Sequence, residues 1–257
     1  MNALEDNEFS REWERMGKEL SRPDAILCIS AHWLTRGTSV TAMERPRTIH
    51  DFGGFPPELY QVEYPAPGNP ELAERIRELL ASPSPESSGI GAGMEVSMDQ
   101  GWGLDHGTWS VLRRMFPKAD IPVLQLSIDA GKPASWHYPV ASRLKALRDE
   151  GVLVVASGNI VHNLGKIAWD RMDESGFGFD WALEFDAAIA GFIQSGDDES
   201  IIHWEKLGKA ARLAVPTTDH FLPLLYALGA RESADKVRSL NAKAVAGSLT
   251  MTSYWWE

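Results

Sequence analysis

The chain has 257 residues, of which 44% are hydrophobic and 24% charged, and its formal net charge is −11. This composition indicates a globular protein and excludes a disordered or fibrous one, while the acidic balance argues against nucleic-acid binding. No apolar run approaches the roughly 20 residues that cross a bilayer, and the amino-terminal residues lack the basic and apolar regions of a secretory signal. The single cysteine, Cys28, excludes an internal disulfide and is compatible with a reducing cytoplasm, so we expect a cytoplasmic protein. The charge and the lack of a long apolar run further predict no nucleic-acid or membrane partner.

Apolar periodicity divides the chain into alternating helices and strands. Helices are predicted over 8–20, 70–81, 108–116, 132–150, 180–195, 200–215 and 216–230. Buried or half-buried strands are predicted over 25–31, 39–43, 94–98, 121–128, 152–159 and within 244–257. This alternation predicts an α/β fold whose largely parallel central sheet is flanked by helices. Since no repeat or linker is visible, residues 1–257 are predicted to form a single domain.

Local signals set several boundaries. Asn69 is expected to cap the second helix and Thr108 to open the third. Pro139 is expected to bend or restart the fourth. Residues 45–70, rich in glycine, proline and aromatic side chains, predict a long ordered loop of the kind that often carries function. Residues 82–93, rich in serine, proline and glycine, predict a flexible insertion.

Four of the seven histidines stand where a predicted element begins or ends: His32, His106, His162 and His220. Parallel α/β sheets present such positions to one shared crevice, which makes a metal or catalytic site a serious candidate. Taken singly, each histidine is better explained by a structural role, and their spacing shows no compact metal motif. The four together leave the two interpretations evenly balanced.

The other histidines and the cysteine give weaker indications of a functional site. His137 and His203 lie in helical stretches, which favours packing or surface roles. His50, in the aromatic loop, can either line a pocket mouth or form a loop hydrogen bond. Cys28 lies inside an apolar strand, where a buried and inert thiol is expected. The sequence contains no nucleophile elbow, phosphate-binding loop or dinucleotide fingerprint.

Seven segments carry a family resemblance. In chain order they are SAHW, TIHDFGGFP, YPAPG, DHGTW, PVLQLSID, ASGNIVHNL and PTTDHFLPLLYALGA. Together they resemble the 4,5-DOPA extradiol dioxygenase family. This family belongs to the class III extradiol ring-opening dioxygenases and is related to protocatechuate 4,5-dioxygenase. The resemblance spans essentially the whole chain.

The resemblance implies a metal-centred pocket. His32 and His220 match metal ligands of the family, and His162 matches a residue that serves either as a ligand or as the acid–base group. His106 matches a further polar residue that faces the substrate. The family's first ligand belongs to a G-H-G-S-P motif directly ahead of the segment that MNALEDN resembles. We therefore expect the family's N-terminal strand and first ligand to be missing from residues 1–257.

The implied activity is cleavage of a catechol such as DOPA, with insertion of both atoms of dioxygen beside the two hydroxyls. His162 or His106 would move the phenolic proton, and His50, Phe52 and Trp33 would bind the substrate. Zinc is redox-inert, so we expect Fe(II) to support ring cleavage and Zn(II) to occupy the site on isolation.

Two alternatives use the same histidines. One is a zinc-dependent hydrolase of an amide or ester, and the other is a metal-binding protein with a degraded site. The partners expected for the dioxygenase are a small catechol and dioxygen, with the chain a monomer or small homo-oligomer.

Overall fold

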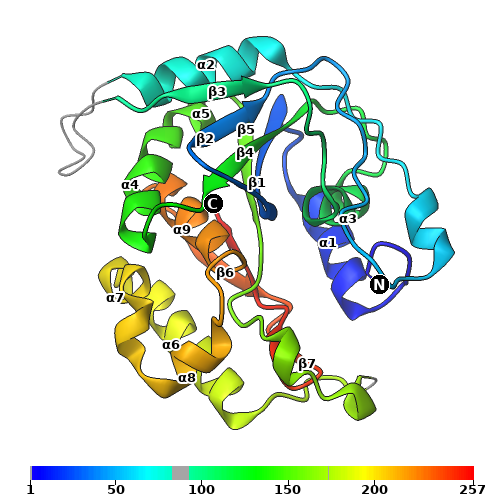
Figure 1. Cartoon of the computed structure of the whole chain (residues 1–257), viewed down its shortest axis with the longest axis vertical. Coiled ribbons are helices and arrows are strands. Elements are labelled where there is room, and N and C mark those ends of the chain that lie inside the picture. Colours follow the sequence, from blue (N-terminus) through cyan, green and yellow to red (C-terminus); the bar gives the residue numbers. More distant parts are fainter. Residues whose placement is uncertain (1, 83–92, 173) are drawn as a thin grey trace.

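The computed structural model in Figure 1 describes residues 2–82, 93–172 and 174–257. A five-stranded sheet with the order β3-β2-β4-β1-β5 lies at its centre. Its strands are β1 (Ala25–Thr35), β2 (Thr38–Thr41), β3 (Val96–Asp99), β4 (Val123–Asp129) and β5 (Val152–Ser157). β1 pairs in parallel with β4 and β5, and β2 pairs in parallel with β3. Within this sheet, and among the residues that the structure describes, only the β2–β4 pairing is antiparallel, so the predicted largely parallel sheet is confirmed.

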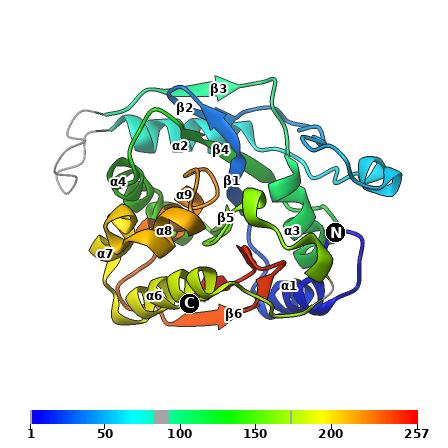
Figure 2. The same cartoon turned by 60° about the horizontal axis from the view of Figure 1, so that its bottom comes forward.

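Helices cover both faces of this sheet (Figures 1 and 2). The amphipathic α1 (Glu8–Glu19) and α3 (His106–Met115) pack on one face. The other face is covered by α2 (Pro70–Ala81), α4 (Ala134–Leu144) and α9 (Leu222–Ala230). The remaining helices are α5 (Ala146–Asp149), α6 (Asp180–Ser195), α7 (Asp198–Ile202) and α8 (Lys209–Ala214). Among the described residues, no helix is both long and apolar enough to cross a bilayer.

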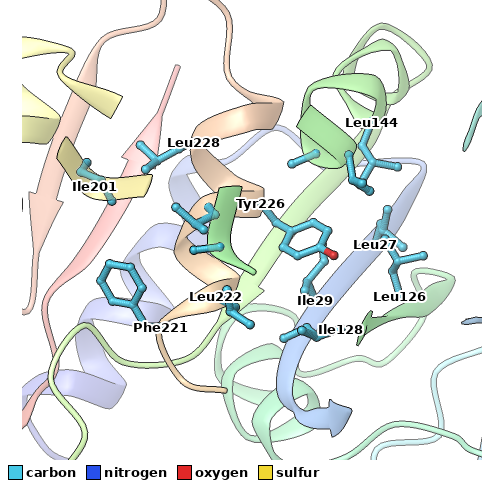
Figure 3. Packing of buried hydrophobic residues seen from close by; sticks show 14 of the residues in the cluster. Leu27, Ile29, Leu126, Ile128, Leu144, Ile201, Phe221, Leu222, Tyr226 and Leu228 are labelled. Carbon is cyan, nitrogen blue, oxygen red and sulfur yellow. The ribbon is translucent and has the colours of Figure 1, made fainter. Parts of the chain in front are cut away.

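The side-chain alternation of β1 explains why both faces are buried. Successive residues of a strand point to opposite faces. Ile26 therefore packs with the α1–α3 cluster, whereas Leu27 and Ile29 pack with the cluster under α4 and α9, and all three are fully buried. Figure 3 shows Leu27 and Ile29 among the side chains of that second cluster, with Tyr226 of α9 beside them. Burial of each such side chain contributes about 1.5–3 kcal/mol.

The C-terminal segment forms two small antiparallel sheets where one last strand was predicted. β6 (Val237–Leu240) pairs with β9 (Ser253–Trp256), and β7 (Ala244–Val245) pairs with β8 (Leu249–Thr250). The single-strand prediction within 244–257 is therefore wrong.

Other boundaries also differ from the sequence-based expectation, and β1 continues to Thr35 instead of ending at residue 31. The third helix begins at His106 rather than Thr108, because Asp105 is its N-cap and accepts a 3.0 Å hydrogen bond from the Thr108 amide. The fourth helix continues through Pro139 and is interrupted at Lys145. The Asn69 cap is confirmed by a 2.9 Å bond from the Leu72 amide. The flexible insertion expected over 82–93 lies almost entirely outside the described residues.

Candidate metal and substrate site

The four singled-out histidines converge at the carboxyl end of the parallel strands. His32 lies near the end of β1 and His162 follows β5, while His106 opens α3 and His220 precedes α9. The ring centroids of His106 and His32 are 3.9 Å apart, and those of His32 and His220 are 5.0 Å apart. His162 stacks on His220 with the ring centroids 3.5 Å apart. Four imidazoles thus form one continuous row of rings.

A glycine allows His32 to approach α3. A Cβ atom on Gly107 would lie 2.9 Å from Cδ2 of His32 and 2.4 Å from the hydroxyl oxygen of Ser30. The helix backbone therefore packs directly against the end of β1, and no larger residue fits there without displacement. The Ser157 hydroxyl of the neighbouring strand also donates to the Gly107 carbonyl at 2.7 Å. Two strands and one helix thus fix the place from which His32 extends.

His220 is held by an asparagine whose orientation is itself fixed. The side-chain amide of Asn159 donates to the carbonyl of Thr250 at 2.8 Å, which directs its oxygen to Nδ1 of His220 at 3.1 Å. Nδ1 of His220 therefore carries the proton, and Nε2 retains a free lone pair. His162 is placed by its backbone, whose amide donates to the carbonyl of Ala214 at 2.9 Å.

An aspartate that the sequence analysis did not single out completes the cluster. Oδ1 of Asp51 accepts the backbone amide of His106, and Oδ2 accepts from Nδ1 of the same residue, both at 2.9 Å. The same Oδ2 lies 3.8 Å from Nδ1 of His32. The sequence does contain a signal for Asp51, because it is the acidic residue of the segment TIHDFGGFP, which carries the family resemblance. This segment lies in a loop, where no periodicity shows which way a side chain points.

Burial keeps three of the imidazoles neutral. It lowers the pKa of His32, an effect reinforced by His106, and it lowers the pKa of His162. The pKa of His220 falls well below its usual value because of burial and then because of His162. Neutral imidazoles are the form that binds metal, so the protonation states of these residues fit a metal site.

Two overlapping sets of side chains could hold a metal ion. Ligand atoms of His32, Asp51 and His106 all lie within 4.8 Å of one another. His32 is also close to the stacked pair His220 and His162. Two histidines with one carboxylate, or three histidines, are donor sets that transition metals accept. The residues present therefore fit the metal that the family resemblance implies.

Aromatic side chains from the predicted functional loop stand beside His106. The Phe52 ring lies edge-on to the ring of His106, with the centroids 5.3 Å apart. The centroids of the Phe52 and Tyr60 rings are 4.9 Å apart. His50 lies 5.8 Å from Phe52, and its Nε2 is 3.0 Å from the carbonyl oxygen of Val62. This loop supplies an apolar wall next to the histidine row.

The structure gives Trp33 a different setting from Phe52. Its side chain is 4% exposed and stacks on Trp102, with the ring centroids 5.7 Å apart. Phe55 is exposed, and its ring packs edge-on against the Phe52 ring with the centroids 5.4 Å apart. Of the two aromatic residues predicted to bind the substrate, Phe52 and Trp33, the structure thus brings the ring of Phe52 against the ring of His106.

The remaining histidines and the cysteine lie outside this cluster. His137 is fully buried, with Nδ1 3.0 Å from the Tyr226 hydroxyl, and His203 is solvent-accessible beside Glu199. Cys28 is fully buried, and burial raises the pKa of its thiol. These are the packing, surface and inert roles that the sequence predicted.

Comparison with known proteins identifies relatives over nearly the whole chain. The family model described as the catalytic LigB subunit of aromatic ring-opening dioxygenase matches residues 3–254. A 4,5-DOPA dioxygenase extradiol of Escherichia coli K12 is 48% identical over 98% of this chain and 89% of that protein. The Beta vulgaris protein of the same name is 37% identical over 99% of this chain and 91% of its own length.

One solved structure supports the same relationship. The crystal structure of an uncharacterized protein from Escherichia coli K12 superimposes with a TM-score of 0.78 at 39% sequence identity. The match covers 98% of this chain and 93% of that one.

Proposed function

Because this chain belongs to the family of the catalytic LigB subunit of aromatic ring-opening dioxygenases, we propose that it cleaves a catechol such as DOPA in an extradiol, metal-dependent reaction that inserts both atoms of dioxygen. Membership makes the chain an oxidoreductase of the ring-opening class that acts on a small molecule with dioxygen. The observation that carries the finer proposal is the convergence of four histidines, three of them kept neutral by burial.

His32, His220 and His162 are the residues proposed to hold the metal. Their support is the 5.0 Å and 3.5 Å separations of neighbouring rings and the free Nε2 of His220. Bound Fe(II) would acidify the catechol hydroxyls and relay electrons between substrate and dioxygen, whereas redox-inert Zn(II) would fill the site on isolation without supporting ring opening.

The chain's own side chains would bind the substrate and move its proton. His106 is proposed to accept a catechol proton, because it neighbours His32 and its Nδ1 is already engaged by Asp51. His162 is the second candidate, if it does not serve as a ligand. Phe52 and His50 are proposed to face the aromatic ring, and Trp33 would contribute through its packing on Trp102.

The test is anaerobic loading with Fe(II) followed by measurement of oxygen uptake and coloured ring-opened product with several catechols. The expected result is both signals in the parent chain, their loss in His32→Ala, and their retention in His203→Ala, which alters a solvent-accessible histidine outside the cluster. Hydrolysis of amides or esters without oxygen uptake would favour the zinc hydrolase. Metal binding without either activity would favour a degraded site.

A further inference from the structure

One carboxylate makes both of its close hydrogen bonds to a single residue. Asp51 accepts the backbone amide of His106 through Oδ1 and its Nδ1 through Oδ2, each at 2.9 Å. The 3.8 Å separation from Nδ1 of His32 is too long for a hydrogen bond. Asp51 is therefore directed at His106, and the side chain of Asp51 is only 15% exposed.

The chemistry of this contact determines which nitrogen of His106 carries the proton. Oδ1 of the Asp51 carboxylate accepts the backbone amide of His106, and Oδ2 faces Nδ1 of the His106 ring at 2.9 Å. An ionised carboxylate only accepts hydrogen bonds, so Nδ1 of His106 must donate. In the neutral imidazole the lone pair then belongs to Nε2.

The backbone of His106 is held as firmly as its ring. Its neighbour Asp105 caps α3 and exchanges two hydrogen bonds with the buried Gln125, at 2.8 and 2.7 Å. Phe52, which directly follows Asp51 in the chain, packs against the His106 ring. One loop therefore provides both the carboxylate that orients the imidazole and the aromatic wall beside it.

We propose that Asp51 is a positioning residue for ring opening: it holds His106 as the Nδ1–H tautomer, which leaves Nε2 free to accept the catechol proton. This inference rests on the proposed dioxygenase function. It assigns Asp51 to the histidine base rather than to the metal, although Asp51 stands within 4.8 Å of two imidazole donors.

The first experiment does not need activity. Long-range nitrogen–proton NMR correlations of the histidine rings in the metal-free chain report the tautomer directly. The parent chain should show His106 protonated at Nδ1. In Asp51→Asn the side-chain amide can donate to Nδ1, so the population should shift to the Nε2–H form. A parent chain with Nε2–H, or an unchanged tautomer in Asp51→Asn, overturns the proposal.

The second experiment uses the Fe(II)-loaded chain. Asp51→Asn should lower kcat by about 100-fold or more with little change in the KM for the catechol, because a positioned base typically contributes at least that factor. Asp51→Glu should restore part of the rate, and Asp170→Asn, at an exposed position, should leave it unchanged.

Metal affinity distinguishes a positioning role of Asp51 from a role as a metal ligand. Equal metal affinity of Asp51→Asn and the parent chain is expected, and a loss of 10-fold or more would overturn the proposal, because Asp51 would then act on the metal as a ligand or as the partner of a ligand. If the parent chain opens no catechol ring, the proposed function fails, while the NMR result still decides the role of Asp51 toward His106.

Discussion

The close approach of α3 to β1 gives the sharpest stability prediction. Replacing Gly107 by alanine places a Cβ atom 2.4 Å from the Ser30 hydroxyl oxygen and 2.9 Å from Cδ2 of His32. Ser30 is fully buried within the sheet, so its hydroxyl can move only by displacing neighbouring groups. The substitution must therefore displace α3, the end of β1 or the His32 ring.

Two opposing terms set the size of the effect. Alanine is favoured over glycine inside a helix by about 1 kcal/mol, which would stabilise the variant. Overpacking a buried contact costs about 1–3 kcal/mol, and both contacts here are shorter than normal packing allows. The expected net change is a destabilisation of up to about 2 kcal/mol.

Gly191 supplies a matched control, since it lies within α6 and a Cβ atom there would have no neighbour within 4 Å. Gly191→Ala should stabilise the protein by up to about 1 kcal/mol. The free energies of unfolding of the two variants should thus differ by about 1–3 kcal/mol, or roughly 2–12 °C in Tm for a chain of this size.

Urea and thermal unfolding measure this difference, and competitive zinc titration measures the displacement of His32. Gly107→Ala should bind zinc at least 10-fold more weakly than the parent, while Gly191→Ala should bind it equally. Equal stability of the two variants would refute the reasoning, as would undiminished zinc affinity in Gly107→Ala.

Three further predictions concern groups around the site and the core. Asn159→Ala removes the acceptor that fixes the His220 tautomer, so metal affinity should fall about 10- to 100-fold in a competition titration; an unchanged affinity argues against this role. Asp105→Ala removes the α3 cap and leaves Nε2 of the buried Gln125 without its acceptor, which should cost about 2–4 kcal/mol in urea unfolding, whereas a loss below 1 kcal/mol contradicts the assignment. Burial lowers the pKa of His137 from 6.5 to about 4, so the unfolded chain binds more protons between these values and stability rises with pH there, by up to about 1.4 kcal/mol per pH unit. His137→Gln should flatten that part of the stability curve, and an unaltered slope would show that His137 does not titrate as described.

Strand ends were predictable from sequence, and so was the position of most site histidines. A polar residue that follows a run of apolar residues, as His32 follows AILCISA, is expected near the end of a buried strand; β1 itself continues to Thr35, so His32 lies inside it, beyond Ser30, the last residue that pairs with β5. The same logic placed His162 after β5. Their mutual distances were not predictable, because they depend on how α3 and the segment before α9 pack onto the sheet.

Asp51 shows where sequence reasoning stopped. It lies 55 residues before His106 in a loop, where no periodicity indicates the direction of a side chain. The boundary of α3 was misplaced for a related reason, since both Asp105 and Thr108 are acceptable capping residues, and the structure uses Asp105, whose Oδ1 accepts from the Thr108 amide.

The C-terminal strands were missed because they are short. β7 and β8 each have only two residues. They lie in the segment between β6 and β9, which pair with each other. Segments of this length carry too few alternating residues for a period to be recognised.

The central claim is that this chain opens a catechol ring with both atoms of dioxygen. The most direct measurement is mass spectrometry of the product formed by the Fe(II)-loaded chain from DOPA under isotopically labelled dioxygen. We predict a ring-opened product that carries two labelled oxygen atoms, formed only when oxygen and metal are both present. A product without label, or one formed equally well in the absence of oxygen, would contradict the account.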